Sequence, residues 1–233
     1  MVSKPRKGRS GDVRTGPICV LASGGLDSCV LLATLASAHE AVHPLYIRAG
    51  LAWEEAELYA LRRFLRALRL RTTRPLKILD LAAGDLYGPH WSVNGKKVPD
   101  YDAEDESVYL PGRNILLLTK SAVFCALHQI PTLALAPLQH NPFPDSQPEF
   151  FREMERALAR GLNFPIRIDM PFSGLSKRDV IFRGRHLPLE VTLSCIDPKG
   201  RAHCGTCVKC AERQRAFRAA RVKDRTRYRK ARR

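Results

Sequence analysis

The 233-residue sequence has no hydrophobic run approaching the roughly 18 residues that a membrane-spanning helix requires. Its N-terminus, residues 1–14, is basic and also lacks the apolar stretch of a secretory signal. We therefore expect a cytoplasmic protein without membrane contact. Internal repeats are absent as well, so the 45% hydrophobic content is expected to fill one sizeable core, with at most a small appended subdomain.

Acidic residues are few: 23 Asp and Glu stand against 39 Lys and Arg, which gives a net charge of +16. The surplus lies at the two ends of the chain. Residues 1–16 have five basic residues and one acidic residue, and residues 211–233 have eleven and two, so residues 17–210 are nearly balanced. The basic ends could bind weakly to a nucleic-acid backbone, or they could be solubilising extensions. The sequence leaves both readings open.

Two common nucleotide motifs are also missing, but residues 23–28 read Ser-Gly-Gly-Leu-Asp-Ser between an apolar strand pattern and an apolar helix pattern. The segment has neither the Walker lysine nor the G-x-G-x-x-G spacing. Its glycines let backbone N–H groups approach a ligand closely, and the following helix adds unpaired N–H groups at its N-terminus. The pattern indicates a phosphate site; the alternative is a plain strand-to-helix turn capped by Asp27 or Ser28.

Strand and helix patterns alternate along the body of the chain. We expect strands at 17–22, 41–47, 76–81, 132–136 and 166–170, and helices at 29–35, 54–70, 114–126, 148–162 and 176–186. The last helix is expected to begin at a capping box formed by Ser176 and Asp179. This order predicts an α/β fold with a Rossmann-like, mainly parallel sheet, helices on both faces and ligands at the carboxyl ends of the strands. Residues 84–110 lack periodicity, which is typical of a functional or mobile segment.

Seven cysteines in a cytoplasmic chain do not indicate a disulfide framework. Three lie in apolar stretches and are expected to be buried; the other four are Cys195, Cys204, Cys207 and Cys210. Two overlapping C-x-x-C steps bring three thiols into a compact knuckle. Four thiolates suit a structural, tetrahedral Zn²⁺ site, an iron–sulfur cluster can use the same ligands, and free thiols are the third reading. His203 is expected to be an exposed surface residue.

Five short motifs occur in one order: Ser-Gly-Gly-Leu-Asp-Ser at 23–28, Pro-Gly-Arg-Asn at 111–114, Pro-Asp at 144–145, Ser-Lys at 176–177 and Ser-Cys at 194–195. In this order and spacing, residues 17–217 resemble the 7-cyano-7-deazaguanine synthase family, the queuosine-biosynthesis branch of the PP-loop ATP pyrophosphatases. The resemblance implies an ATP-dependent carbon–nitrogen ligase that acts on 7-carboxy-7-deazaguanine and ammonia. The carboxylate would be adenylated, converted to the amide, activated again and dehydrated to the nitrile.

The resemblance also implies site residues and cofactors. ATP would be bound by Ala22, Ser23, Gly24, Gly25, Leu26, Asp27, Ser28 and Lys177. Asp27 and Arg113 would be catalytic, and the planar guanidinium of Arg113 suits bidentate binding of a phosphate or carboxylate. Mg²⁺ would accompany the phosphates and Zn²⁺ the four cysteines. The oligomeric state is left open, with a homodimer as one candidate. The chain would divide into a basic extension (1–16), an ATP-binding α/β domain (17–190), a zinc-binding subdomain (191–217) and a basic tail (218–233).

The segments that would face the second substrate depart from the family pattern. Residues 47–53 and 135–143 differ from the usual family segments, and Ser146 replaces a usual cysteine. The expected substrate is therefore 7-carboxy-7-deazaguanine or a related carboxylate. A PP-loop enzyme that modifies a tRNA nucleobase directly is the second reading. A nucleotide- or nucleic-acid-binding module without turnover is the third.

Overall fold

A five-stranded parallel sheet forms the centre of the molecule, with the strand order β3-β2-β1-β4-β5. The computed structural model describes residues 15–139 and 141–230, so most of the N-terminal extension expected at 1–16 and the last three residues of the chain lie outside it. The strands are β1 (Ile18–Leu21), β2 (Val42–Arg48), β3 (Lys77–Asp80), β4 (Thr132–Ala134) and β5 (Arg167–Asp169). Each predicted strand is confirmed to within two residues.

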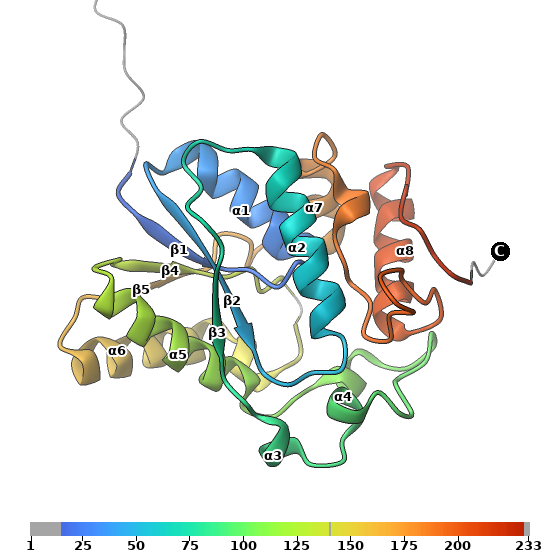
Figure 1. Cartoon of the computed structure of the whole chain (residues 1–233), viewed down its shortest axis with the longest axis horizontal. Coiled ribbons are helices and arrows are strands. Elements are labelled where there is room, and N and C mark those ends of the chain that lie inside the picture. The colour runs from blue at the N-terminus through green and yellow to red at the C-terminus, as the bar shows by residue number, and fades with distance from the viewer. Residues whose placement is uncertain (1–14, 140, 231–233) are drawn as a thin grey trace, which may run out of the picture.

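Helices cover both faces of this sheet, as predicted (Figure 1). They are α1 (Leu26–Ala38), α2 (Glu54–Leu68), α3 (Gly84–Tyr87), α4 (Trp91–Asn94), α5 (Arg113–Leu127), α6 (Pro148–Leu162), α7 (Lys177–Arg183) and α8 (Val208–Ala220), with 3-10 turns η1 (Asp105–Val108), η2 (Pro144–Ser146) and η3 (Leu189–Val191). One core joins the sheet to α1, α2, α7 and α8, and another joins it to α5 and α6. The Rossmann-like α/β fold is thereby confirmed.

Local sequence signals account for several helix ends. The predicted capping box of α7 is present: the Asp179 backbone N–H donates to the Ser176 hydroxyl (3.2 Å), and the Ser176 N–H donates to the Asp179 carboxylate (3.1 Å). Helix α6 begins with Pro148 in its first turn and ends where Asn163 adopts a left-handed conformation. These signals fix where α6 begins and ends and where α7 begins, and therefore where the adjoining loops lie.

Residues 84–110 fold into the short helices α3 and α4 and the turn η1 rather than a long helix or strand. Trp91 of α4 stacks on Trp53, with ring centroids 5.6 Å apart and an interplanar angle of 18°. This segment packs in a third core with the four cysteines. It therefore joins the sheet domain to the C-terminal knuckle.

The last part of the described chain folds back after α8. Arg213 of α8 is fully buried and donates to Thr192, Ser194, Thr226 and the Leu189 carbonyl oxygen at 2.7–3.1 Å. Burying a guanidinium is costly unless its donors are satisfied, so this network fixes the returning segment. Within residues 15–139 and 141–230, none of the helices has both the length and the apolar character that crossing a lipid bilayer requires.

Candidate active site

The Ser-Gly-Gly-Leu-Asp-Ser loop lies at the carboxyl end of β1, the central strand of the sheet. From β1 the chain builds β2 and β3 on one side and then crosses to β4 on the other. Parallel sheets bind ligands at such a reversal, because the loops from the two strands diverge and leave a crevice. The loop therefore faces the expected ligand-binding edge of the sheet.

Gly24 lets this loop lie directly against α2. Its φ is +79°, and a Cβ on it would be 2.4 Å from the backbone carbonyl oxygen of Glu57. The Ser28 hydroxyl donates to the Gly25 carbonyl oxygen and accepts from the Ser23 N–H, both at 3.2 Å. Gly25 is the N-cap of α1, and no side chain caps this helix. The first N–H groups of α1 therefore face the crevice without the side-chain cap that the alternative reading required.

Asp27 in the first turn of α1 is paired with Lys177 in the first turn of α7. Lys177 Nζ lies 2.6 Å from Asp27 Oδ2 and 3.2 Å from Glu212 Oε1 of α8. Burial acts to lower the pKa of Lys177, but the two carboxylates outweigh burial and raise it above its ordinary value. Burial likewise acts to raise the pKa of Glu212, but Lys177 and Lys209 lower it to about 2. Three helices thus meet in a charged cluster.

Asp27 also keeps one unsatisfied oxygen. Its Oδ1 is buried and has no hydrogen-bond partner among the described residues. Buried polar atoms are nearly always satisfied, so an orphaned carboxylate oxygen at a crevice calls for a ligand. A hard divalent cation such as Mg²⁺ prefers such an oxygen, so the Asp27 carboxylate fits the expected metal.

Arg113 is the first residue of α5, and it lines the crevice together with the loop. Its Nε is also buried without a partner in the described part of the chain. The neighbouring Asn114 is fixed by Asp145: its N–H donates to Asp145 Oδ2 (3.0 Å), and its side-chain amide donates to the Asp145 carbonyl oxygen (2.8 Å). A carboxylate at this helix N-terminus stabilises the helix start and fixes where Arg113 emerges. Arg113 can thus present donors to an anion in the crevice.

The crevice consists of two adjoining cavities of about 410 and 250 Å³. Ser23, Gly25, Asp27 and Arg113 line both of them, so the loop and the guanidinium stand at their boundary. Lys177, Lys209 and Glu212 line the larger cavity only. Of the predicted ATP-binding residues, all but Gly24 line one or both cavities, together with Arg113. The combined space is large enough for two small substrates.

Glu57 of α2 also lies at the boundary of the two cavities, and the sequence analysis does not single it out. It lines both cavities, and its carboxylate accepts a hydrogen bond from Tyr46 Oη (3.1 Å). Burial raises its pKa to about 7, although Arg113 and the Tyr46 hydroxyl act to lower it. A signal was available: Glu57 precedes Leu61 by one helical turn, so an acid interrupts the apolar face of this helix.

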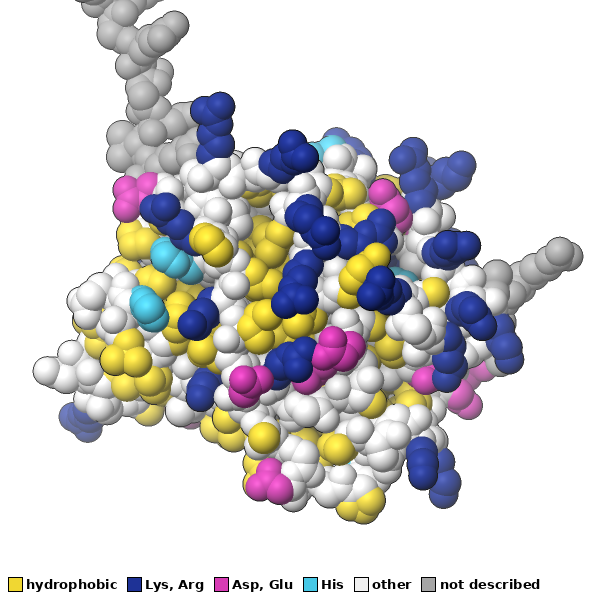
Figure 2. Space-filling model, viewed as in Figure 1, with side chains coloured by type: hydrophobic (Ala, Val, Ile, Leu, Met, Phe, Trp, Pro, Cys, Tyr) yellow, Lys and Arg dark blue, Asp and Glu magenta, His cyan; other side chains and the backbone are white. Residues whose placement is uncertain are grey.

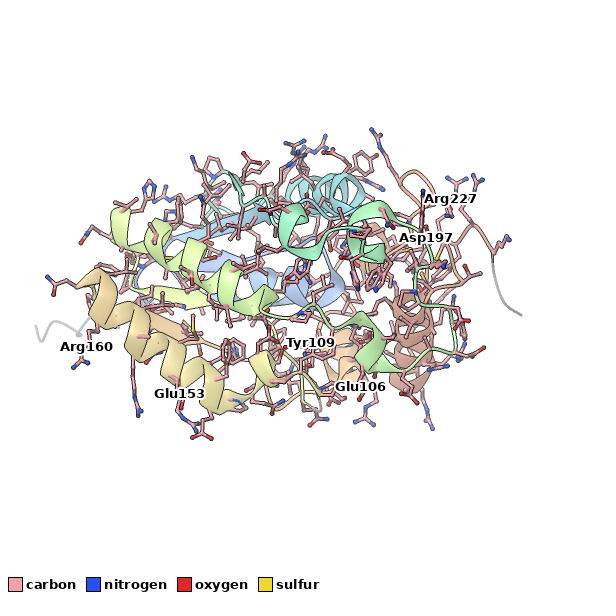
Figure 3. The ribbon with its side chains drawn as sticks, turned by 90° about the horizontal axis from the view of Figure 1, so that it is seen from below. Glu106, Tyr109, Glu153, Arg160, Asp197 and Arg227 are labelled. Carbon is pink, nitrogen blue, oxygen red and sulfur yellow. The ribbon has the colours of Figure 1, made fainter. Side chains whose placement is uncertain are left out.

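The segment after β4 supplies polar and aromatic side chains to the larger cavity. Gln139, Asn141 and Phe143 line it. The Phe143 ring lies 5.0 Å from that of Tyr109, which Figure 3 shows close to the start of α5. An aromatic surface beside side-chain amides can stack on a planar heterocycle and hydrogen-bond its edge.

The four C-terminal cysteines converge, as their spacing indicated. All four are buried, and their sulfur atoms lie within 4.8 Å of one another. Cys195 and Cys204 are 3.5 Å apart, and the Cys195–Cys207 and Cys204–Cys210 pairs are 3.9 Å apart. A tetrahedral Zn²⁺ with bonds of about 2.3 Å requires sulfur separations of about 3.8 Å. The donor set therefore fits a single zinc ion.

The expectation that His203 is an exposed surface residue is wrong. Its side chain is buried beside the knuckle, and its Nε2 accepts a hydrogen bond from the Ser194 N–H (3.1 Å). Burial and the nearby Arg213 lower its pKa to about 3, which keeps the ring neutral and able to accept. The ring is buried because the returning C-terminal segment covers it: Tyr228 packs edge-on against it at 5.5 Å.

Comparison with known proteins agrees with this geometry. The family described as "Queuosine biosynthesis protein QueC" matches residues 17–221. The 7-cyano-7-deazaguanine synthase of Anaeromyxobacter dehalogenans is 34% identical over 226 residues, which cover 91% of this chain and 95% of the relative. The 7-cyano-7-deazaguanine synthase 1 of Desulfitobacterium hafniense is 31% identical over 204 residues, which cover 86% and 90%.

A solved structure supports the fold alone. The U34-tRNA thiolase NcsA from Methanococcus maripaludis superposes with a TM-score of 0.53 at 11% identity, covering 93% of this chain and 76% of the thiolase. At that identity the likeness concerns the arrangement of the sheet and helices, not the reaction. The family match and the curated relatives span nearly the whole described chain, and the chain belongs to the QueC family of queuosine biosynthesis.

Proposed function

We propose that this protein is an ATP-dependent ligase that converts 7-carboxy-7-deazaguanine and ammonia into 7-cyano-7-deazaguanine. The observation that carries the proposal is the boundary of the two cavities, where the Ser-Gly-Gly-Leu-Asp-Ser loop faces Arg113, in a chain of the QueC family. If ATP and the carboxylate substrate bind in the two cavities, the ATP phosphates and the carboxylate meet at this boundary. A related heterocyclic carboxylate is the alternative substrate, because residues 135–143 differ from the family pattern.

The chemistry requires activation of a carboxylate, which is a poor electrophile because oxide is a poor leaving group. Attack of one carboxylate oxygen on the α-phosphorus of ATP breaks the α–β bond and releases pyrophosphate. Ammonia then displaces AMP from the acyl adenylate and gives the amide. Attack of the amide oxygen on a second ATP forms an imidate adenylate, and loss of AMP and a proton gives the nitrile. Each round consumes one ATP, so two AMP and two pyrophosphates form per nitrile.

The residues at the boundary suit these steps. The backbone N–H groups of Gly24, Leu26, Asp27 and Ser28 would donate to phosphate oxygens as negative charge develops on the leaving pyrophosphate, whereas the Gly25 N–H donates to the Ser23 hydroxyl (3.2 Å). Arg113 is placed to hold the carboxylate or the α-phosphate in a two-pronged contact. Lys177 adds positive charge and fixes the Asp27 carboxylate, whose free oxygen would bind Mg²⁺. The metal would neutralise phosphate charge.

Glu57 is placed to accept a proton. Ammonia must lose a proton after it attacks the acyl adenylate, and an acceptor with a pKa near the working pH is effective. The pKa of Glu57 is about 7, and its carboxylate lines both cavities. We assign Glu57 this role and assign Tyr46, which donates to its carboxylate, a positioning role.

The knuckle is proposed to be a structural zinc site. A cluster core of several iron atoms would hold its thiolates further apart than a single ion does, and the 3.5–3.9 Å separations favour the single ion. Four thiolates leave no open position for catalysis. Zn²⁺ would instead fix the position of residues 195–196, which line the larger cavity.

The test is product formation by purified protein. With ATP, Mg²⁺, ammonium and 7-carboxy-7-deazaguanine, mass spectrometry should detect the nitrile, and AMP should accumulate instead of ADP. Arg113→Lys should lose activity at least tenfold, because an ammonium cannot make the bidentate contact. AMP and the amide without the nitrile would limit the activity to the first activation, and AMP formed only with a related heterocyclic carboxylate would indicate the alternative substrate. Absence of AMP in all reactions would contradict the proposal.

A further inference from the structure

A separate cavity of about 450 Å³ lies outside the active-site crevice. It is formed by α2, η3, the knuckle loop at 199–203 and the returning C-terminal segment. Of its lining residues only Leu193 also lines the active-site crevice. The nitrile chemistry proposed above therefore makes no use of this cavity.

The lining of this cavity is strongly basic. Its charged side chains are those of Arg63, Lys199, Arg201, Arg227 and Arg229, against a single acid, Glu190. Lys199 is paired with Asp197 at 2.8 Å. The four arginines are exposed and form no ion pair with a described residue. Four guanidinium groups converge here with little to neutralise them, so the cavity attracts anions.

The C-terminal segment presents its charges in an alternating pattern. Lys223, Arg225, Arg227 and Arg229 are exposed, whereas the intervening residues are partly buried and bonded inward. Tyr228 Oη donates to Asp224 Oδ2 (2.7 Å), and Thr226 accepts from the buried Arg213 (2.9 Å). Alternation along an extended chain places the basic side chains in a row on one face.

This row is fixed rather than free. The backbone N–H groups of Arg229 and Lys230 donate to the carbonyl oxygens of His203 (2.8 Å) and Cys204 (3.1 Å). Gly205 allows the close passage, because a Cβ there would lie 1.8 Å from the Lys230 carbonyl oxygen. For residues 218–230 the structure therefore excludes an unattached tail. A preorganised row of charges loses less entropy on binding than a flexible tail does.

The basic surface continues beyond the cavity. A smaller cavity of about 170 Å³ shares Glu190 with it and is lined by Arg185, Lys223 and Arg225. Figure 2 shows Lys and Arg side chains on the face that carries α2 and toward the end that carries α8. The basic residues of the two cavities together cover more surface than a single phosphate would contact. Insertion into a membrane surface would favour exposed hydrophobic side chains beside the charges. None of the large exposed hydrophobic residues of the described chain lines either cavity.

We propose that this basic track, made of Arg63, Arg201, Arg225, Arg227 and Arg229, binds the phosphodiester backbone of a nucleic acid. The inference goes beyond the proposed function, whose substrate and product are free bases. Arginine forks match phosphate oxygens, and a row of them follows successive phosphates without reading bases. Tyr59 sits under the track, with the Arg201 guanidinium 4.0 Å from its ring centroid, which orients that arginine.

The test compares two charge-reversal variants of the full chain. Fluorescence anisotropy would measure binding of a labelled 20-nucleotide RNA, of unfractionated tRNA and of a DNA duplex between 50 and 200 mM salt. Arg227→Glu/Arg229→Glu changes the track. Arg156→Glu/Arg160→Glu changes the net charge equally on α6, and Figure 3 shows Arg160 at the end of the molecule away from Arg227.

The track variant should bind at least tenfold more weakly than the unsubstituted protein, and the α6 variant should stay within twofold. The slope of log Kd against log salt should fall by about 1.4–1.8 in the track variant, since each lost phosphate contact removes about 0.7–0.9. Stronger binding of RNA than of the DNA duplex would identify RNA as the nucleic acid that the track binds. Equal binding would show that the track binds either backbone. Equal losses in both variants, or no binding at 50 mM salt, would overturn the proposal. Nitrile synthesis should be unchanged in both variants, so this result is independent of the proposed function.

Discussion

Gly24→Ala tests whether the loop must lie against α2. The added Cβ would be 2.4 Å from the Glu57 carbonyl oxygen and 3.1 Å from the Leu61 backbone nitrogen, and neither backbone atom can rotate away. Forcing a methyl group into a filled site costs about 1–3 kcal/mol. The φ of +79° costs an L-residue about 1–2 kcal/mol more. Reduced freedom of the unfolded chain offsets about 0.4–1 kcal/mol of this.

Gly95→Ala is the matched control, because Gly95 is left-handed with a φ of +67°, and a Cβ on it would meet only the Ala52 Cβ, at an ordinary contact distance of 3.5 Å. The two variants share the positive φ and differ in the clash. Gly24→Ala should therefore lose about 1–3 kcal/mol more unfolding free energy than the control.

Urea unfolding followed by circular dichroism measures this difference. With a slope of about 2 kcal/mol per molar urea, the midpoint of Gly24→Ala should lie about 0.5–1.5 M below that of Gly95→Ala. The KM for ATP should rise in Gly24→Ala only, because either the loop or the first turns of α2 must move. Equal midpoints and equal KM values would refute the reasoning that close backbone approach sets the loop position.

Three further predictions follow from the site. Glu57→Gln should abolish the rise of the reaction rate near pH 7. The unfolded chain releases the Glu57 proton near pH 4.5 and the folded protein near pH 7, so the unsubstituted protein should lose stability as the pH rises through that range, while the variant should not. An identical pH dependence of stability in both proteins would contradict the raised pKa. Lys177→Met removes the cation between two partly buried carboxylates and should cost about 2–3 kcal/mol in urea unfolding, whereas Lys199→Met, at an exposed pair, should cost less than about 1 kcal/mol. Cys207→Ser should lower the zinc content by metal analysis and the Tm together; a metal-free protein with an unchanged Tm would exclude a structural site.

The sheet could be predicted because its signals are local. Short apolar runs alternate with amphipathic stretches, and each of the five strands lies within two residues of its predicted bounds. The loop at 23–28 could be placed for the same reason, since strand, turn and helix are consecutive. Local patterns also identified the capping box at Ser176 and the convergence of the cysteines.

Contacts between distant parts of the chain could not be predicted in this way. Lys177 and Asp27 are 150 positions apart, and only the fold brings the first turns of α7 and α1 together. Residues 222–230 have the basic composition of a solvated tail, yet they dock because Arg213 is buried among hydroxyl and carbonyl oxygens. That docking also buries His203, which by itself has the sequence context of a surface residue.

The most direct test of the account follows oxygen atoms through the reaction. 7-Carboxy-7-deazaguanine labelled with ¹⁸O in both carboxylate positions would be incubated with the protein, ATP, Mg²⁺ and ammonium, and the products analysed by mass spectrometry. Because each activation transfers one substrate oxygen to the α-phosphate, the account predicts two AMP per nitrile, each with one ¹⁸O. Unlabelled AMP, or label in phosphate or pyrophosphate, would contradict activation of the carboxylate by adenylation.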